Sequence, residues 1–299
     1  MLRRPALLLT ALAGASALLV AGCAPQEEAG GAAGASSAGG SASATTTASC
    51  SPADLKTLTP GTFTVATDTP AYAPWFSDDD PSNGKGYESA VAYAVAGQLG
   101  YSKDAVTWKV GSFNAAIAPG PKDFDVDINQ FSITDERKQA VDFSTPYYDV
   151  AQAVVTEGSS KAASVTTLAG LKDLRLGAQV GTTSYTAITD QIKPSTQPSV
   201  FNTNDDAVAA LKNGQVDAIV VDLPTAFYMA GAQLDAGKVV GQLQTPSGGA
   251  TDTFGMVLDK GSPLTACVSR AVDTLRADGT LAKLQQQWLD EAAQAPVLT

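Results

Sequence analysis

Histidine is absent from this 299-residue chain, and basic residues are scarce, because 19 Lys and Arg against 30 Asp and Glu leave a net charge of −11. Without histidine, the chain lacks the side chain that most often moves protons near neutral pH and most often binds metals. With few cations, it has no basic field that could hold a phosphate backbone. The composition therefore argues against nucleic-acid binding, and we expect no metal or cofactor.

Long apolar runs are also missing, apart from one at the N-terminus. Arg3 and Arg4 precede an Ala/Leu-rich stretch over residues 5–20, which is shorter than the roughly 20 apolar residues of a membrane span. This pattern is typical of a secretory signal, expected here over residues 1–22. The stretch ends in Leu-Val-Ala-Gly-Cys at Cys23, which resembles a bacterial lipobox, whose cysteine carries a diacylglycerol after cleavage. The alternative is an ordinary cleavage site and a freely secreted protein.

Cysteine is rare as well, with 3 in the chain. If Cys23 is acylated, Cys50 and Cys267 remain. Outside the cytoplasm such a pair usually forms a disulfide, although two free buried thiols are the alternative. Residues 23–49 are mostly Gly, Ala, Ser and Thr and have too little apolar bulk to order themselves, which predicts a flexible tether between lipid and folded body.

The folded region alternates short strand-like runs with helical patterns. Tyr87, Val91, Val95 and Leu99 recur every four residues, as on one face of a helix. The C-terminal apolar pattern predicts a helical pair broken at 278–279. Strands are expected at Phe63–Ala66, Thr107–Val110, Phe124–Ile128, Leu174–Ala178 and Asp217–Val221. Strands that alternate with helices indicate an α/β fold with largely parallel sheets.

Polar residues gather where these strands end. Asp68, Gln130, Gln179 and Asp222 all follow predicted strands, and ligands of open α/β sheets bind beyond the carboxyl ends of strands. A free amino acid needs a planar cation for its carboxylate and an anion for its ammonium. Arg137 is a candidate cation in Ser-Ile-Thr-Asp-Glu-Arg, where Thr134 is expected to cap a helix. Taken alone, the same stretch also fits a solvated helix start.

The stretch 127–137, with Ala-Val-Asp-Phe-Ser-Thr-Pro-Tyr-Tyr over 140–148, resembles the hallmark of family 3 extracellular solute-binding proteins, the polar amino-acid receptors of ABC importers. Further similar motifs occur in the family's order, from about Pro60 to Trp288. They are Val-Ala-Thr-Asp at 65–68, Tyr-Ala-Pro-Trp at 72–75, Gly-Thr-Thr at 181–183, the run 210–222 and Ala-Asp-Gly-Thr at 277–280.

The resemblance implies roles for particular residues. Arg137 would grip the ligand carboxylate with Thr182 and Thr183, and Asp222 would take the ammonium. The other implied contacts are Ser132, Gln130 and Gln179 for hydrogen bonds, Tyr72, Trp75 and Phe113 as aromatic walls, and Asp68 at the far end of the ligand. Asp68 favours a polar or basic amino acid over an apolar one. Ala90, the loop 118–123, Asn129 and Gln130 depart from the family pattern, which leaves the side-chain pocket open.

The resemblance also implies the architecture. We expect a periplasmic-binding-protein-like type II fold, with residues 51–150 plus 252–299 in lobe 1 and 151–251 in lobe 2. The crossings are expected near 151–156 and 245–253, with Cys50 and Cys267 on one lobe. The protein would be a monomeric, lipid-anchored, extracytoplasmic importer component that delivers its amino acid to an ABC permease and is no enzyme. The alternatives are an extracytoplasmic enzyme on the same scaffold (a dehydratase or lyase) and a ligand-sensing lipoprotein.

Overall fold

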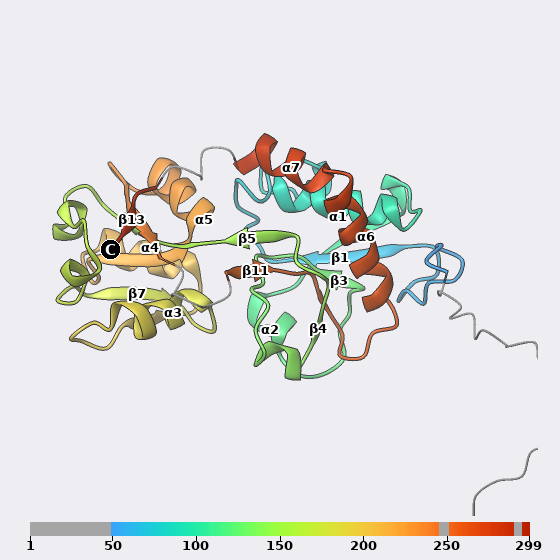
Figure 1. Ribbon diagram of the computed structural model, residues 1–299, viewed down its shortest axis with the longest axis horizontal. Helices are drawn as coiled ribbons and strands as arrows, with labels where there is room; N and C mark the ends of the chain where they lie inside the picture. The colour runs from blue at the N-terminus through green and yellow to red at the C-terminus, as the bar shows by residue number, and fades with distance from the viewer. Residues whose placement is uncertain (1–48, 245–250, 290–294) are drawn as a thin grey trace, which may run out of the picture. The chain divides into compact units, whose positions relative to one another are not determined.

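The computed structural model of the protein (Figure 1) describes residues 49–244, 251–289 and 295–299. The predicted signal sequence over 1–22, the predicted lipidation site Cys23 and nearly all of the predicted tether lie outside these ranges. The folded body described below belongs to one unit, Ala48–Thr299. None of its described helices has the length and apolar composition of a membrane span.

The first sheet has the strand order β2-β1-β3-β12-β4. The interior strand β1 (Phe63–Thr67) is buried at every position and pairs in parallel with both neighbours, β2 and β3. Such continuous burial is typical of parallel strands that are covered on both faces. The remaining strands are β2 (Val106–Val110), β3 (Val126–Asp127), β12 (Val257–Leu258) and β4 (Asp142–Phe143). β12 is antiparallel to both β3 and β4.

Helices α1 (Tyr87–Gln98), α6 (Thr265–Ala277) and α7 (Thr280–Leu289) pack against one another beside this sheet (Figure 1). The predicted periodicity of the first helix is confirmed, because Tyr87, Val91 and Val95 are all fully buried. The predicted break between the last two helices is also confirmed. Gly279 stands there with φ 79°, a left-handed conformation that glycine adopts without steric cost. The short helix α2 (Phe113–Ile117) follows β2.

The second sheet has the order β13-β10-β6-β9-β7-β8. Parallel pairs join β9 to β7 and β7 to β8, whereas β6 is antiparallel to β9 and β10. Its strands are β6 (Gln152–Thr156), β7 (Leu176–Gln179), β8 (Ser199–Phe201), β9 (Ala218–Asp222), β10 (Lys238–Leu243) and β13 (Val297–Leu298). The helices of this part are α3 (Thr183–Ala187), α4 (Asn204–Lys212) and α5 (Leu223–Tyr228).

An antiparallel pair, β5 (Tyr148–Val150) with β11 (Asp252–Phe254), forms a separate two-stranded sheet. Figure 1 shows this pair between the two larger sheets. The first crossing was expected at 151–156, but residues 152–156 are β6 of the second sheet. The connecting strand therefore lies a few residues earlier than expected, since every residue of β6 is buried in that sheet.

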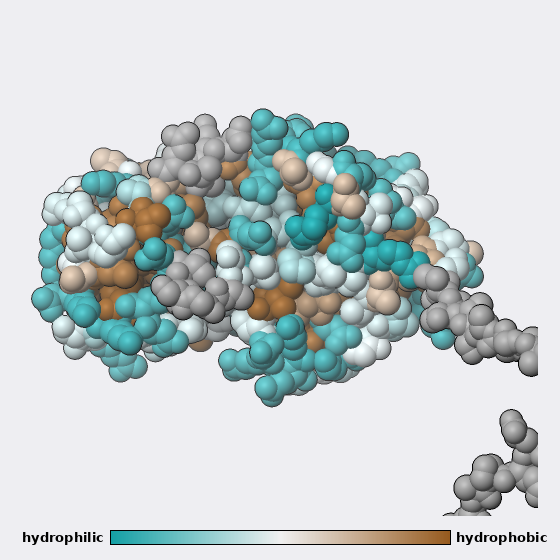
Figure 2. All heavy atoms as spheres, in the orientation of Figure 1, coloured by the Kyte–Doolittle hydropathy of each residue, from teal (hydrophilic) through white to brown (hydrophobic). Residues whose placement is uncertain are grey.

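The last residues of the chain differ from the expected lobe boundary of 252–299. β13 pairs in parallel with β10, so it belongs to the second sheet rather than the first. Leu298 is 1% exposed and Val297 is 46% exposed, as expected for a strand whose side chains alternate between faces. Figure 2 shows hydrophobic residues gathered at the end of the view where Figure 1 places β13. Burial of Leu298 explains why so short a segment docks there.

A disulfide joins Cys50 to Cys267 of α6, which confirms the expected pairing. The two residues are 217 positions apart in sequence. The bond therefore fixes the first residues of the folded body to a C-terminal helix. In the chain-entropy model, closing so long a loop constrains the unfolded chain by up to about 5 kcal/mol.

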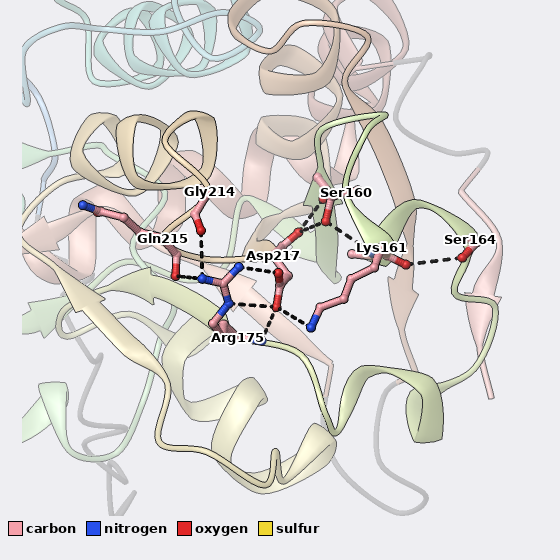
Figure 3. Close-up of polar contacts among 9 residues, drawn as sticks. Ser160, Lys161, Ser164, Arg175, Gly214, Gln215 and Asp217 are labelled. Carbon is pink, nitrogen blue, oxygen red and sulfur yellow. Dashed lines mark hydrogen bonds and ion pairs between the residues drawn. The ribbon is translucent and has the colours of Figure 1, made fainter.

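Asp217, just before β9, is the centre of a polar cluster in the second sheet (Figure 3). Its carboxylate accepts hydrogen bonds from Arg175 Nη2 at 2.7 Å, Arg175 Nε at 3.2 Å and the Arg175 backbone N–H at 2.7 Å. Lys161 Nζ lies 3.3 Å away. The Arg175 guanidinium also donates to the Gly214 and Gln215 carbonyls. The cluster joins the turn before β9 to the start of β7.

We expect Asp217→Asn to destabilise the protein. Burial alone would raise the pKa of Asp217, but the bonds from Arg175 and Lys161 lower that pKa from 3.8 to about 2. A carboxyl whose pKa is depressed in the folded state contributes stability above its unfolded pKa and loses it as the pH falls. Urea unfolding should show a loss of about 2 kcal/mol at pH 7, shrinking between pH 4 and pH 2. The exposed Asp235→Asn is the control, and equal losses for both variants would contradict this account.

Candidate ligand-binding site

A cavity of about 140 Å³ lies between the strand ends of the two sheets. All predicted ligand-binding residues except Trp75 line it, namely Asp68, Tyr72, Phe113, Gln130, Ser132, Arg137, Gln179, Thr182, Thr183 and Asp222. The cavity is smaller than the roughly 300–1,000 Å³ of pockets for drug-sized ligands. Its volume therefore fits a small metabolite.

Trp75 does not reach this cavity. Trp75 is 1% exposed, and its ring packs edge-on against Tyr87, Tyr148 and Phe254. All four side chains belong to one hydrophobic core. The Trp75 indole N–H donates to Thr225 Oγ1 of α5 at 2.9 Å. The expectation that Trp75 forms an aromatic wall of the site thus differs from the structure, because its ring fills the apolar core instead.

Arg137 is the only cation that lines the cavity in the described part of the chain. Its guanidinium donates from Nη1 to the Ser132 carbonyl at 2.7 Å and from Nη2 to the Gly181 carbonyl at 2.8 Å. Its Cζ also lies 5.2 Å from the centre of the Phe113 ring. Burial lowers the pKa of Arg137, and the nearby Asp222 opposes that shift. The group is held in a fixed orientation, and further N–H donors remain for a ligand.

The local structure around Arg137 differs from the predicted helix. Only a single 3₁₀ turn, Arg137–Gln139, is formed. Thr134 nevertheless accepts a hydrogen bond from the Arg137 backbone N–H at 3.1 Å, as a capping residue would. The chain then continues into β4 at Asp142.

The Gly-Thr-Thr turn faces Arg137 from the second sheet. Gly181 has φ 72°, and Thr182 caps α3 by accepting a hydrogen bond from the Tyr185 N–H at 3.3 Å. Thr183 Oγ1 lies 3.1 Å from Ser132 Oγ. The two halves of the predicted carboxylate site are thus joined by direct hydrogen bonds between the sheets.

Asp222, the last residue of β9, carries the opposite charge. Its Oδ1 accepts a hydrogen bond from Gln152 Nε2 at 2.7 Å. Burial raises the pKa of Asp222 to about 7, while the Gln152 hydrogen bond and the charge of Arg137 lower it. Among the described residues, the ion pairs include neither Arg137 nor Asp222. Both charges therefore lie in one cavity without a protein counter-ion in direct contact.

Tyr72 and Asp68 line the end contributed by the first sheet. The Tyr72 hydroxyl donates to Asp205 Oδ2 at the start of α4, and its ring lies 5.8 Å from that of Tyr228. Asp68 accepts from the Phe113 N–H at 3.2 Å. Tyr72 thus adds another direct contact between the two parts of the chain, beside those of Arg137, Ser132 and Trp75.

Sequence reasoning missed the start of α4. Thr203, Asn204 and Asp205 also line the cavity, and Thr203 caps the helix by accepting from the Asp206 N–H at 3.1 Å. The Thr-Asn-Asp-Asp spacing is a recognisable helix start and could have located this boundary. It could not have shown that the helix start faces the same cavity as Arg137.

The chain belongs to family 3 of the bacterial extracellular solute-binding proteins, whose family model matches residues 63–291. This match confirms the family resemblance inferred from the motifs at 127–137 and 140–148. The fold is that of type II periplasmic binding proteins, as predicted.

Individual relatives agree with this assignment. The chain is 29% identical over 219 residues to the L-cystine-binding protein TcyJ of Escherichia coli (strain K12), covering 73% of this chain and 79% of that protein. Among solved structures, an ancestral arginine-binding protein bound to arginine is 30% identical with TM-score 0.62, covering 77% and 98%. The ancestral amino acid-binding protein AncCDT-1, a precursor of cyclohexadienyl dehydratase, is 30% identical with TM-score 0.61, covering 76% and 95%.

Proposed function

We propose that this protein is the extracytoplasmic receptor of an amino-acid ABC importer and that it clamps one free amino acid between its two sheets. One observation carries the proposal: Arg137, in the turn between β3 and β4 of the first sheet, and Asp222, at the end of β9 in the second, line the same small cavity, and neither forms an ion pair among the described residues. Buried charges are costly without partners. An α-amino acid would supply both partners at once, its carboxylate to Arg137 and its ammonium to Asp222.

The charge of the cavity favours a polar or basic ligand. Asp68, Asp205 and Asp222 line it against a single guanidinium. A ligand with a second cation in its side chain balances this excess of carboxyl groups, whereas an acidic side chain adds to it. Relatives named for binding L-cystine, arginine, glutamine and histidine support the same range.

The contacts between the sheets suggest how binding is coupled to closure. Arg137 to Gly181, Ser132 to Thr183 and Tyr72 to Asp205 all join residues from the first sheet's part to the second's. A ligand held by both sides binds the closed arrangement more tightly than an open one and so shifts the equilibrium toward closure. In this proposal, residues 51–150 with most of 252–299 form one lobe, residues 151–251 form the other, and β5 with β11 forms the hinge.

A thermal-shift screen tests the proposal. The twenty amino acids plus ornithine, citrulline and cystine are compared at fixed concentration, and each hit is measured by calorimetry. A ligand at a hundred times its Kd should add about 2.7 kcal/mol of stability. We expect arginine, lysine or ornithine to rank above glutamate and leucine. If no amino acid shifts the unfolding midpoint, the proposed function is wrong.

The N-terminal segment would tether the receptor to the outer face of the cell membrane. Arg3 and Arg4, the apolar run and Cys23 carry this part of the proposal. Two acyl chains on one cysteine give stable anchoring, whereas one chain is marginal. The receptor would act as a monomer that presents its closed form to a membrane permease.

Replacement of Cys23 by serine should release the protein from membranes. The hydroxyl cannot form the thioether to diacylglycerol, so the anchor is lost while the folded body is unchanged. Fractionation of the producing cells should move the protein from the membrane pellet to the soluble fraction. Ala21→Ser, next to the same cleavage site, is the control that keeps the cysteine. Membrane retention of a processed Cys23→Ser protein would refute the anchor.

An enzyme on the same scaffold is the second candidate, because AncCDT-1 is a precursor of a dehydratase. Asp68 and Asp222 would then serve as acid and base. Product formation from a cyclic carboxylic acid substrate would favour this alternative. A sensory lipoprotein would bind the same ligands, and genes for a permease and an ATPase beside its own would favour the importer.

A further inference from the structure

Glu88 does not line the cavity, but its carboxyl group is hydrogen-bonded to Gln130, which does. Glu88, in the first turn of α1, is fully buried. Its Oε1 accepts from the Gln130 backbone N–H at 2.7 Å, and its Oε2 accepts from the Gln130 side-chain amide. The Tyr147 hydroxyl donates to the same carboxyl group. Its place in the first turn of a helix also favours a negative group. The two hydrogen bonds from Gln130 mean that Glu88 holds both the backbone and the side chain of that residue.

Gln130 needs such support because of its backbone. Its φ is 49°, in the left-handed region that residues with a Cβ rarely adopt. Gln130 follows β3, lies two residues before Ser132 and is one of the residues that line the cavity. Without the hydrogen bonds that Glu88 makes to its backbone N–H and its side-chain amide, Gln130 would relax toward a negative φ and the turn would change.

This turn fixes the group that would bind the ligand carboxylate. Phe131, the next residue, stacks on Phe113 with ring centres 4.8 Å apart. Arg137 lies over Phe113 and donates to the Ser132 carbonyl. A displacement of the turn at Gln130 would therefore move both the ring and the carbonyl that orient the guanidinium.

We infer that Glu88 is a positioning residue of the binding site, which holds Gln130 in its left-handed turn and thereby sets the orientation of Arg137. Glu88 acts through hydrogen-bond acceptance rather than through its charge. Where ligand affinity is the readout, the inference rests on the proposed function. A measurement without ligand keeps the two separate.

The first test compares two substitutions at the same position. In Glu88→Gln, the amide oxygen still accepts from the Gln130 N–H, and the amide nitrogen can donate to Gln130 Oε1 once that amide is turned over. Methionine has similar length and accepts no such bonds. With L-arginine as the probe, we expect Glu88→Gln to bind within about threefold of wild type. Glu88→Met should bind roughly 10–100-fold more weakly, since buried donors are left unsatisfied. Equal losses would mean that charge matters, and would overturn the inference.

The second test replaces Gln130 by a residue that needs no hydrogen bonds to keep a positive φ. Glycine adopts a positive φ without strain, so Gln130→Gly should keep the turn without Glu88. A double-mutant cycle compares the effect of Glu88→Met on the Kd for L-arginine with Gln and with Gly at position 130. With Gly at position 130, the fold-increase in Kd should be less than a third of the fold-increase in the wild-type background. Additive losses would overturn the inference. Should Glu88→Met not fold, Gln130→Ala against Gln130→Gly decides the matter. Alanine keeps the strain and lacks the amide, so it should bind several-fold more weakly, and equal affinities would count against positioning.

The same cycle is measured on thermal unfolding without ligand. Glu88→Met should lower the unfolding midpoint by roughly 4–8 °C, and by less than half as much with Gly at position 130. Glu157→Met, in the partly exposed turn after β6, is the matched control and should change neither quantity. If wild type binds no amino acid, the proposed function fails, while this ligand-free cycle still decides whether Glu88 holds Gln130.

Discussion

Arg137→Ala should weaken binding of the best amino acid from the screen by at least about 100-fold. Arg137 is 8% exposed and its guanidinium is already fixed by the Ser132 and Gly181 carbonyls, so its remaining donors meet a ligand carboxylate without reorganisation. The variant loses a charge-assisted, two-point contact and leaves the ligand carboxylate buried without a partner, which together cost about 3 kcal/mol or more. Isothermal calorimetry at pH 7.5 gives the Kd directly.

The matched control for this variant is Lys138→Ala. Lys138 is the neighbouring cation, but it is exposed and its ammonium pairs with Asp135 on the surface. We expect its Kd to stay within twofold of wild type, because exposed ion pairs contribute little. Circular dichroism and the unfolding midpoint without ligand establish that Arg137→Ala is folded. A folded Arg137→Ala protein with wild-type affinity would remove the site assignment and the proposed function together.

Much of this site was predictable because the chemistry lies in short contiguous segments. Asp68 and Asp222 each end or follow a strand whose apolar run is easy to read, and the carboxyl ends of such strands meet in α/β folds. Arg137 was located by its motif rather than by periodicity. The structure shows why, since the segment around it makes only one 3₁₀ turn and has no helical pattern to detect.

The errors share a physical origin in contacts between distant residues. Trp75 stands one position after a proline in a loop, a place that fits either a cavity wall or a core. Its packing against Tyr148 and Phe254 decides for the core, and both residues are far away in sequence. β13 likewise depends on β10, which no local pattern at Val297 indicates. The role of Glu88 required knowing that Gln130 turns with a positive φ, and sequence alone does not give that angle.

Asp222→Asn should abolish tight binding and, at the same time, raise the stability of the ligand-free protein. The partly buried carboxyl has a pKa of about 7, raised from 3.8 chiefly by its removal from water. When folding raises the pKa of a carboxyl group, its contribution to stability falls as the pH rises from the unfolded-state pKa to the folded-state pKa. Above pH 7 this contribution is lost, because the ionised carboxyl is then held in a poorly solvated place. The amide has no such cost and can still accept from Gln152. We therefore expect a higher unfolding midpoint at pH 8 together with at least a 100-fold weaker Kd, because the ligand ammonium loses its anion.

The pH dependence of binding separates this role from a merely steric one. A ligand ammonium stabilises the ionised form of Asp222, so binding releases a proton wherever the free protein is still protonated. Wild-type affinity should therefore rise about tenfold per pH unit below pH 7 and level off above it, whereas Asp222→Asn should lose that slope. Glu88, whose burial also raises its pKa to about 7, is unchanged in both proteins, so the difference between them isolates Asp222. Parallel pH profiles would show that Asp222 does not face the ammonium, even if the variant binds weakly.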